Sequence, residues 1–131
     1  MKTSRFILLM LFSVAHPGWA QDPIPFSGAW LKSSCEASVE QKAEVPISLD
    51  QMISATACRS YLTGFIQSNA FSEGVLSAKR LFCIPPDGIS AEYAAIVVHA
   101  FATQHSAMSG LPAATIVAAS LKQKFPCPTT P

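Results

Sequence analysis

Residues 48–66, SLDQMISATACRSYLTGFI, carry the clearest structural signal in the chain. Ser48 and Gln51 have the spacing of a capping box, in which the hydroxyl and the amide each satisfy a free backbone N–H at a helix start. The pattern that follows predicts an amphipathic helix, and Gly64 within it predicts that something approaches its backbone closely, because Gly costs about 1 kcal/mol relative to Ala in a helix. The predicted inner face consists of Leu49, Ile53, Ala57, Tyr61 and Phe65, widened by Met52, Leu62 and Ile66.

Upstream of this helix, a short helix is predicted at about 28–37, where Trp30, Leu31 and Cys35 share a face. The polar segment Glu36–Val45 is expected to be a loop that ends at Pro46. Downstream, Asn69–Leu76 is expected to be a turn because it contains Ser72 and Gly74.

Two further helices are predicted after the connector Cys83–Gly88. Ser90 can cap the first of them, whose apolar residues on nearly all sides predict a central position or cover on two sides. The second begins at Pro112 and ends before Pro126. Its predicted inner face consists of Ala113, Ile116, Val117, Ser120, Leu121 and Phe125. About four helices with short connections predict an all-α fold, a compact bundle.

Residues 1–20 have the layout of a secretory signal peptide. Lys2 and Arg5 precede ten apolar residues, and small residues stand before a cleavage position after Ala20. Ten apolar residues are too few to cross roughly 30 Å of hydrocarbon as a helix, so we do not expect a membrane anchor. Residues 21–131 are therefore expected to form one exported helical domain with extended, Pro-rich ends.

The charge balance argues against polyanionic partners. Without the leader, seven basic residues face eight acidic ones. No electrostatic attraction to nucleic acid or to an anionic membrane follows from this balance, and no membrane insertion is expected after leader cleavage.

The four cysteines, Cys35, Cys58, Cys83 and Cys127, all follow the leader. An even count in a small exported domain indicates disulfides, and the count alone allows three connectivities. No Cys-x-x-Cys pair exists, which argues against zinc. If the last two helices are antiparallel, Cys83 lies beside Cys127, which leaves Cys35 for Cys58. A Cys58–Cys83 bond would contradict this pairing.

No group of residues has the pattern of an active site, a metal site or a cofactor site. His99 is interpreted as a core or groove histidine, and His105 as a residue that meets the free carbonyls at a helix end. A Cys–His nucleophile pair would need a free thiol, and four paired cysteines leave none. The sequence thus predicts a protein that is not an enzyme and binds neither metal nor cofactor.

Three motifs together resemble one known family. They are Cys58-Arg-Ser-Tyr-Leu-Thr-Gly64-Phe65, then Cys83-Ile-Pro85 followed by Gly88-Ile-Ser90, and the closing stretch Leu111–Pro128. Their order and spacing resemble the periplasmic immunity proteins of type VI secretion amidase effectors, the Rap/Tai family. The resemblance covers about residues 28–128.

The resemblance implies a small, disulfide-stapled helical homodimer in the periplasm of a Gram-negative bacterium. It implies that the protein protects its producer by binding a peptidoglycan amidase toxin, the cognate effector, which has a Cys–His active site. Members of the family inhibit by capping the amidase cleft with a protruding loop.

One segment departs from the family pattern. Where the family usually has His-Pro-Glu, this chain has His105-Ser106-Ala107, which removes a rigid residue and a charge. The departure leaves the fold inference intact but removes the basis for naming the effector. The predicted partner-binding residues are Gln104, His105, Ser106, Ala107, Met108, Ser109 and Gly110; the alternative is a plain connector in which Met108 packs onto the core.

A second function stays open at this point: a small periplasmic disulfide-linked stress protein or acid chaperone. Such a protein exposes apolar surface when its carboxylates are protonated at low pH. Binding of an apolar dye and protection of client proteins at pH 2–3 would distinguish it from an immunity protein.

Overall fold

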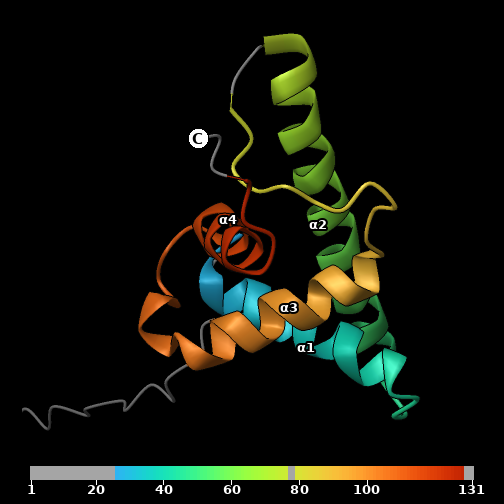
Figure 1. The fold of residues 1–131 in the computed structure, drawn as a ribbon. Helices are drawn as coiled ribbons and strands as arrows, with labels where there is room; N and C mark the ends of the chain where they lie inside the picture. Colours follow the sequence, from blue (N-terminus) through green and yellow to red (C-terminus); the bar gives the residue numbers. More distant parts are fainter. Residues whose placement is uncertain (1–25, 77–78, 129–131) are drawn as a thin grey trace, which may run out of the picture.

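The computed structural model describes residues 26–76 and 79–128, and this part of the chain is helical (Figure 1). Its elements are α1 (Gly28–Lys42), α2 (Leu49–Leu76), α3 (Ala91–Gln104), a single 3-10 turn (Ser106–Met108) and α4 (Ala113–Lys124). The all-α prediction is confirmed. The expected leader, residues 1–20, lies outside the described residues, as does the segment from Gln21 to Pro25.

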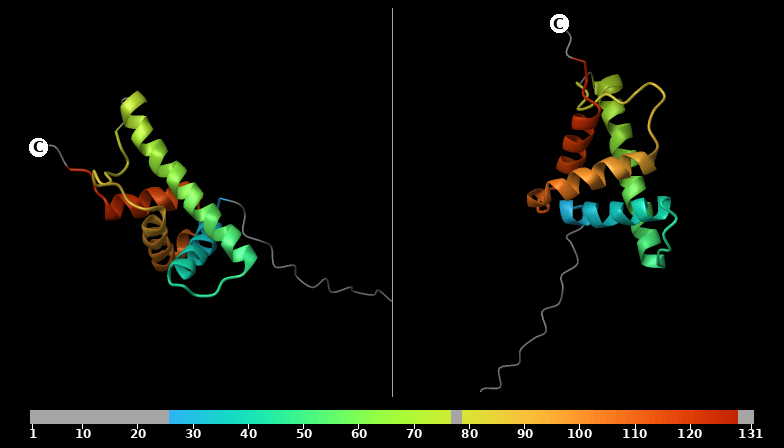
Figure 2. Two further views of the ribbon diagram at one scale, coloured as in Figure 1. Left: turned by 90° about the vertical axis from the view of Figure 1, so that its right-hand side faces the viewer. Right: turned by 60° about the horizontal axis from the view of Figure 1, so that its bottom comes forward.

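The long helix α2 runs along one edge of the molecule, and α1, α3 and α4 all lie on one side of it (Figure 2). α1 packs against both α2 and α3, and α4 packs mainly against α3. In Figure 1, α4 is seen nearly end-on while α3 runs across the view, so the two helices cross. The expectation that they are antiparallel is wrong.

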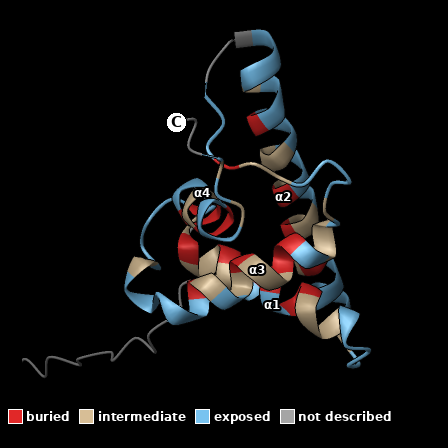
Figure 3. Cartoon of the chain, viewed as in Figure 1, coloured by how far each residue is buried: buried red, intermediate tan, exposed pale blue. Residues whose placement is uncertain are grey.

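The core lies where α1, α2 and α3 meet and continues along the inner face of α4 (Figure 3). α3 contributes mostly small side chains, which lets α1 and α4 approach it closely. The fully buried large residues are Leu31, Leu62, Phe82, Val98, Ile116, Val117 and Leu121. The inner face predicted for α4 is confirmed, with Phe125 partly buried at its end.

The predicted helix starts are confirmed. The Ser48 N–H donates to Gln51 Oε1 at 2.8 Å, and the Gln51 N–H donates to Ser48 Oγ at 3.2 Å. Ser90 Oγ accepts from the Tyr93 N–H at 3.1 Å at the start of α3. These side chains satisfy donors that the first turn of a helix leaves free.

α1 is longer than predicted, because the segment expected to be a loop from Glu36 is helical as far as Lys42. Its buried residues in this part are Ala37 and Ser38, with Ser34 one turn earlier. Small side chains allow a helix to lie close to its neighbours, although they give no apolar periodicity. Tertiary packing therefore extends this helix beyond its sequence signal.

α2 is also longer, since the turn expected at Asn69–Leu76 is helix. Ser72 donates to Ser68 O at 2.8 Å, so its hydroxyl is satisfied within the helix. Buried Asn69 holds the returning chain: its Nδ2 donates to Phe82 O at 3.0 Å, and its Oδ1 accepts from the Leu81 N–H at 2.8 Å.

The inner face predicted for α2 is wrong at the start of the helix but correct further along it, where Leu62 is buried and Tyr61, Phe65 and Ile66 pack against the core. Ala55, Cys58 and Leu62 are buried, whereas Leu49 and Ile53 are among the exposed large apolar residues. The close approach to the backbone that was predicted at Gly64 is also wrong for contacts within the described chain. A Cβ built at Gly64 would meet nothing within 4 Å among the described residues.

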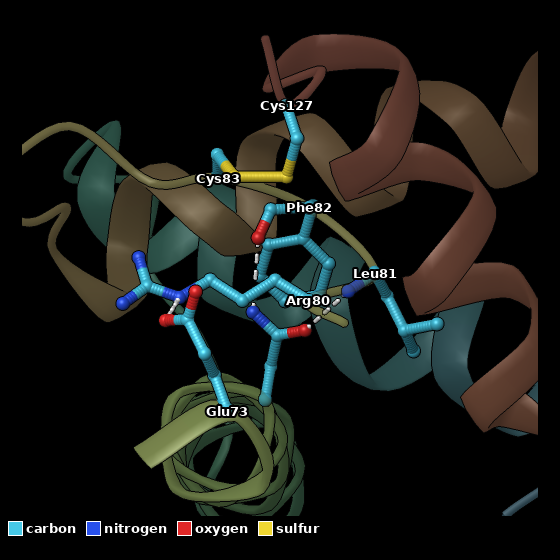
Figure 4. Close-up of a disulfide and its surroundings, with 7 residues drawn as sticks. Glu73, Arg80, Leu81, Phe82, Cys83 and Cys127 are labelled. Carbon is cyan, nitrogen blue, oxygen red and sulfur yellow. Dashed lines mark hydrogen bonds and ion pairs between the residues drawn. A yellow bond between two sulfur atoms is a disulfide. The ribbon is translucent and has the colours of Figure 1, made fainter. Parts of the chain in front are cut away.

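Both predicted disulfides are present, Cys35–Cys58 and Cys83–Cys127. The first links α1 to α2 inside the core. The second joins the connector before α3 to the chain after α4, beside the Glu73–Arg80 ion pair (Figure 4). The Cys83 N–H donates to Phe125 O at 2.9 Å, so the connector itself brings Cys83 to the end of α4.

Candidate partner-binding surface

The seven predicted partner-binding residues form the tip between α3 and α4. Gln104 ends α3, His105 caps it, and Ser106–Met108 form the 3-10 turn that leads into Ser109 and Gly110. Six of the seven are exposed. Met108 is only partly exposed and packs against the core, as the alternative for this segment expected.

His105 is fixed by contacts with Phe101, one turn earlier. Its ring stacks on the Phe101 ring at a centroid distance of 4.1 Å, and Nδ1 lies 2.9 Å from Phe101 O. A carbonyl oxygen only accepts hydrogen bonds, so Nδ1 carries the proton in this contact.

Backbone hydrogen bonds attach this tip to the chain at the start of α1. The Gly28 N–H donates to Leu111 O at 2.8 Å, and the Ala29 N–H donates to Ser109 O at 2.8 Å. The Ala113 N–H donates in return to Phe26 O at 2.7 Å. The first N–H groups of a helix lack partners within it, so α1 uses the loop as its cap. The tip is therefore held at Ser109 by one of these bonds, and the other two hold the chain directly after it, at Leu111 and Ala113.

Gly28 permits this close approach. A Cβ at Gly28 would lie 2.9 Å from Met108 O and 3.1 Å from Ser109 O, closer than a side chain tolerates. Phe26, at φ 61°, turns the chain so that its ring packs on Trp30, with centroids 5.0 Å apart. Glycine and this turn together fix the loop against α1.

A groove of about 390 Å³ lies between α1 and the loop. Sequence reasoning missed the α1 side of this surface. The polar residues Lys32, Ser33 and Glu36 have a helical spacing, but nothing in the sequence shows which loop they face. The groove is lined by Gly28, Ala29, Lys32, Ser33, Glu36, Ala102, His105, Ser106, Met108, Ser109 and Ile116.

A second groove, about 430 Å³ and mostly apolar, lies between α3 and α4. It adjoins the loop at Phe101 and Gln104. Tyr93, Ile96 and Ala100 of α3 line this groove, while the opposite side of the helix faces the core with Ala94, Ala95, Val98 and Ala102. The first groove includes four residues of the loop, whereas this one reaches the loop only at Gln104.

The remaining ionisable groups do not form a reaction centre. His99 is partly buried, and its Nε2 lacks a hydrogen-bond partner in the part of the chain that the structure describes. The backbone N–H of Glu92 and the Ser90 side chain hold the pKa of the Glu92 carboxyl below its ordinary value. Burial raises the pKa of the Tyr61 phenol. Both shifts reflect helix capping or packing.

Catalytic and metal chemistry receive no support from the described residues. All four cysteines are in disulfides, so the chain has no free thiol. Among residues 26–76 and 79–128, no cluster of three or more His, Cys, Asp or Glu residues could hold a metal ion. Over the same residues, no helix combines the length and the hydropathy needed to cross a bilayer.

Comparison with known proteins gives one match. A sequence-family model described as Rap1a immunity proteins matches residues 27–127, from the cap of α1 to the last cysteine. No curated protein and no solved structure matches the chain. Because the match spans the whole described domain and its four cysteines, the chain belongs to the Rap1a immunity protein family.

Proposed function

We propose that this protein is a periplasmic immunity protein that binds and occludes a peptidoglycan amidase toxin delivered by type VI secretion. In this role it acts as a non-enzymatic inhibitor in the producing Gram-negative cell. Family membership supports the immunity role. The two disulfides are consistent with an exported protein, because such bonds persist in oxidising compartments.

The observation that carries the proposal is an exposed polar loop that is fixed in place. Gln104–Gly110 has little apolar packing of its own, yet a backbone bond from Ala29 holds it at Ser109, and the Gly28 N–H bonds Leu111 O directly after it. A loop that is ordered before binding loses less conformational entropy when a partner docks. Such a loop suits insertion into an enzyme cleft better than a mobile connector would.

The proposed contact surface extends beyond the loop to α1. Lys32 and Glu36 border the groove beside His105 and Ser106, so a cation, an anion and an imidazole lie within one small area. Charged groups at the rim of an interface contribute mainly to partner choice and association rate. We infer that Lys32 and Glu36 contribute to the choice of effector, together with the loop residues that depart from the family pattern.

Pairing of two copies, which the family resemblance implies, is part of the same proposal. The occluding loop of each copy then acts on its own amidase, since the loop and its groove are formed within one chain.

The test uses oxidised protein comprising residues 21–131 as bait for the secreted fraction of the producing organism. We expect recovery of a Cys–His amidase whose cleavage of peptidoglycan cross-links falls on binding. Ser106→Arg should weaken capture at least tenfold, because it puts a large side chain on the exposed tip. Ala43→Arg is the matched control, since it places the same side chain at the opposite, exposed end of α1.

Equal capture by the Ser106→Arg variant would contradict the assignment of the loop. Recovery of no amidase by folded, oxidised bait would contradict the immunity function itself.

A further inference from the structure

The two disulfides differ in their exposure to solvent. Cys35 and Cys58 are fully buried and lie within α1 and α2. Cys83 and Cys127 are partly exposed and lie outside the helices, in the connector before α3 and in the chain after α4 (Figure 4). A disulfide opens or closes only when a thiolate reaches one of its sulfur atoms, so access decides which of the two links can react.

The Cys35–Cys58 link is enclosed by the core. Leu31 lies one turn before Cys35 and Leu62 one turn after Cys58, and both leucines are fully buried as well. A thiolate can reach these sulfur atoms only when α1 and α2 separate, which requires the core to open. We therefore expect this link to form before the core closes and to stay closed in the folded domain.

The surroundings of the Cys83–Cys127 link are more open. Both cysteines lie in non-helical chain, and exposed prolines lie within three residues of each of them. These prolines are Pro85, Pro86, Pro126 and Pro128. Proline has no backbone N–H to donate, so these positions are not tied to a neighbouring segment through that group. A second protein can approach this link without displacing a helix.

Contacts other than the disulfide hold the connector in place. Phe82 is fully buried, and its carbonyl accepts from Asn69 Nδ2 at 3.0 Å. The Cys83 N–H donates to Phe125 O at 2.9 Å, two residues before Cys127. These contacts keep the two cysteines near each other when the link is open. The link can then close again without unfolding of the domain.

The order of the cysteines along the chain fits this division. Each cysteine is bonded to the next or the previous one in sequence. The buried pair is complete within the first two helices, whereas the second pair brackets α3 and α4. The buried link can therefore close before the later cysteines take part, and no exchange between wrongly paired cysteines is needed.

We propose that the Cys83–Cys127 link is a site of thiol–disulfide exchange on the folded domain, with a dithiol–disulfide oxidoreductase of the same compartment as the partner. To close the link, one thiolate of the chain attacks the disulfide of the oxidised enzyme and displaces one enzyme sulfur as a thiolate. The second thiolate of the chain then attacks the chain's sulfur in this mixed disulfide. The link forms and the enzyme leaves as a dithiol, having taken two electrons and two protons from the chain. Opening is the reverse reaction, with the reduced enzyme as the donor.

The test exposes folded, oxidised residues 21–131 to reduced thioredoxin as a protein-sized dithiol and, in parallel, to dithiothreitol as a small one. Free thiols are blocked with iodoacetamide at successive times and located by peptide mapping. We expect both reductants to open Cys83–Cys127 about tenfold faster than Cys35–Cys58 or more, with the helical circular dichroism retained. After removal of the reductant, oxidised glutathione should close the link again.

The control is the double variant Cys83→Ser with Cys127→Ser. Its remaining link should open more slowly than the Cys83–Cys127 link of the wild type under the same conditions. Labelling of all four cysteines together, or of Cys35 and Cys58 first, would overturn the proposal. Opening by dithiothreitol but not by thioredoxin would also overturn it, because the link would then be out of reach of an enzyme.

Low concentrations of urea give an independent check. Below the unfolding transition, urea should accelerate the opening of Cys35–Cys58, since this link reacts through unfolded chain, and should hardly change the opening of Cys83–Cys127. An equal urea dependence of the two links would contradict exchange on the folded domain. The inference goes beyond the proposed function, and no toxin is present in these measurements, so their failure would leave the immunity function standing.

Discussion

Gly28 shows how one residue connects the fold to the candidate binding surface. Its N–H donates to Leu111 O at 2.8 Å, and its missing side chain leaves room for the carbonyls of Met108 and Ser109. We expect Gly28→Ala to lower the free energy of unfolding by about 1–3 kcal/mol, because a Cβ would press on backbone that cannot easily move. Urea unfolding with the disulfides intact measures this loss.

Gly74→Ala is the control for that measurement, since a Cβ there meets nothing within 4 Å in the described structure. It should leave stability unchanged or raise it by up to about 1 kcal/mol. Equal effects of the two substitutions would show that the contact between loop and α1 does not constrain residue 28.

Glu92 predicts a pH dependence at the start of α3. Its own backbone N–H and the Ser90 side chain hold its pKa below 4.5 in the folded protein. A depressed folded-state pKa stabilises the fold above the unfolded-state value, and the benefit is lost as the pH falls through the folded-state value. Glu92→Gln should therefore be less stable than the wild type at pH 7 and equal to it at pH 2–3.

Thermal unfolding at the two pH values tests this expectation. Glu44→Gln removes an exposed carboxylate outside a helix start and serves as the control. If the deficit of Glu92→Gln persisted at pH 2–3, the capping role of its carboxylate would be wrong.

At the scale of elements, Asn69 joins the second half of α2 to the connector that returns from it. Its amide bonds both Leu81 N–H and Phe82 O. Asn69→Leu keeps a similar volume but leaves both backbone groups without this partner, so we expect a loss of about 2 kcal/mol or more. The same urea unfolding measures it, and Ser68→Leu on the exposed side is the control. A loss below about 0.5 kcal/mol would contradict the anchoring role.

The helices differ in how much of them could be predicted from sequence. Capping residues such as Ser48 and Ser90 gave correct starts, because a cap depends on residues three or four positions apart. The ends of α1 and α2 could not be predicted. Small buried residues such as Ser38 and a buried amide such as Asn69 stabilise helix only through contacts with distant segments.

Only the start of the apolar face of α2 was wrongly assigned to the core, for a related reason. Periodicity identifies an apolar face but does not show which part of it the other helices cover. Leu49 and Ile53 belong to the exposed face, and the true core residues are the less conspicuous Ala55 and Cys58. In the candidate site, the loop could be predicted from sequence as a connector between two helices. Lys32 and Glu36 lie beside it only because α1 packs there, and the sequence does not show that packing.

At the scale of the whole molecule, two disulfides hold a small core together. Cys35–Cys58 closes 23 positions of sequence and Cys83–Cys127 closes 44. In the chain-entropy picture the longer link is worth about 4 kcal/mol, a large part of the stability of a small domain.

The Cys83–Cys127 link suits a test because both cysteines are partly exposed, whereas Cys35 and Cys58 are fully buried. Replacing Cys83 and Cys127 with Ser should lower the free energy of unfolding by about 2–5 kcal/mol. Denaturant unfolding of the oxidised proteins measures the difference. A change below about 1 kcal/mol would mean that the connector is held mainly by its hydrogen bonds.

The most direct test of the central claim is a titration of the captured amidase with the oxidised protein, with release of cross-link peptides from peptidoglycan as the signal. We predict that cleavage falls in proportion to added protein and ends near one chain per amidase. The Ser106→Arg variant should shift this curve to at least tenfold higher concentration, and Ala43→Arg should not. Undiminished cleavage at a molar excess of folded wild-type protein would contradict the account.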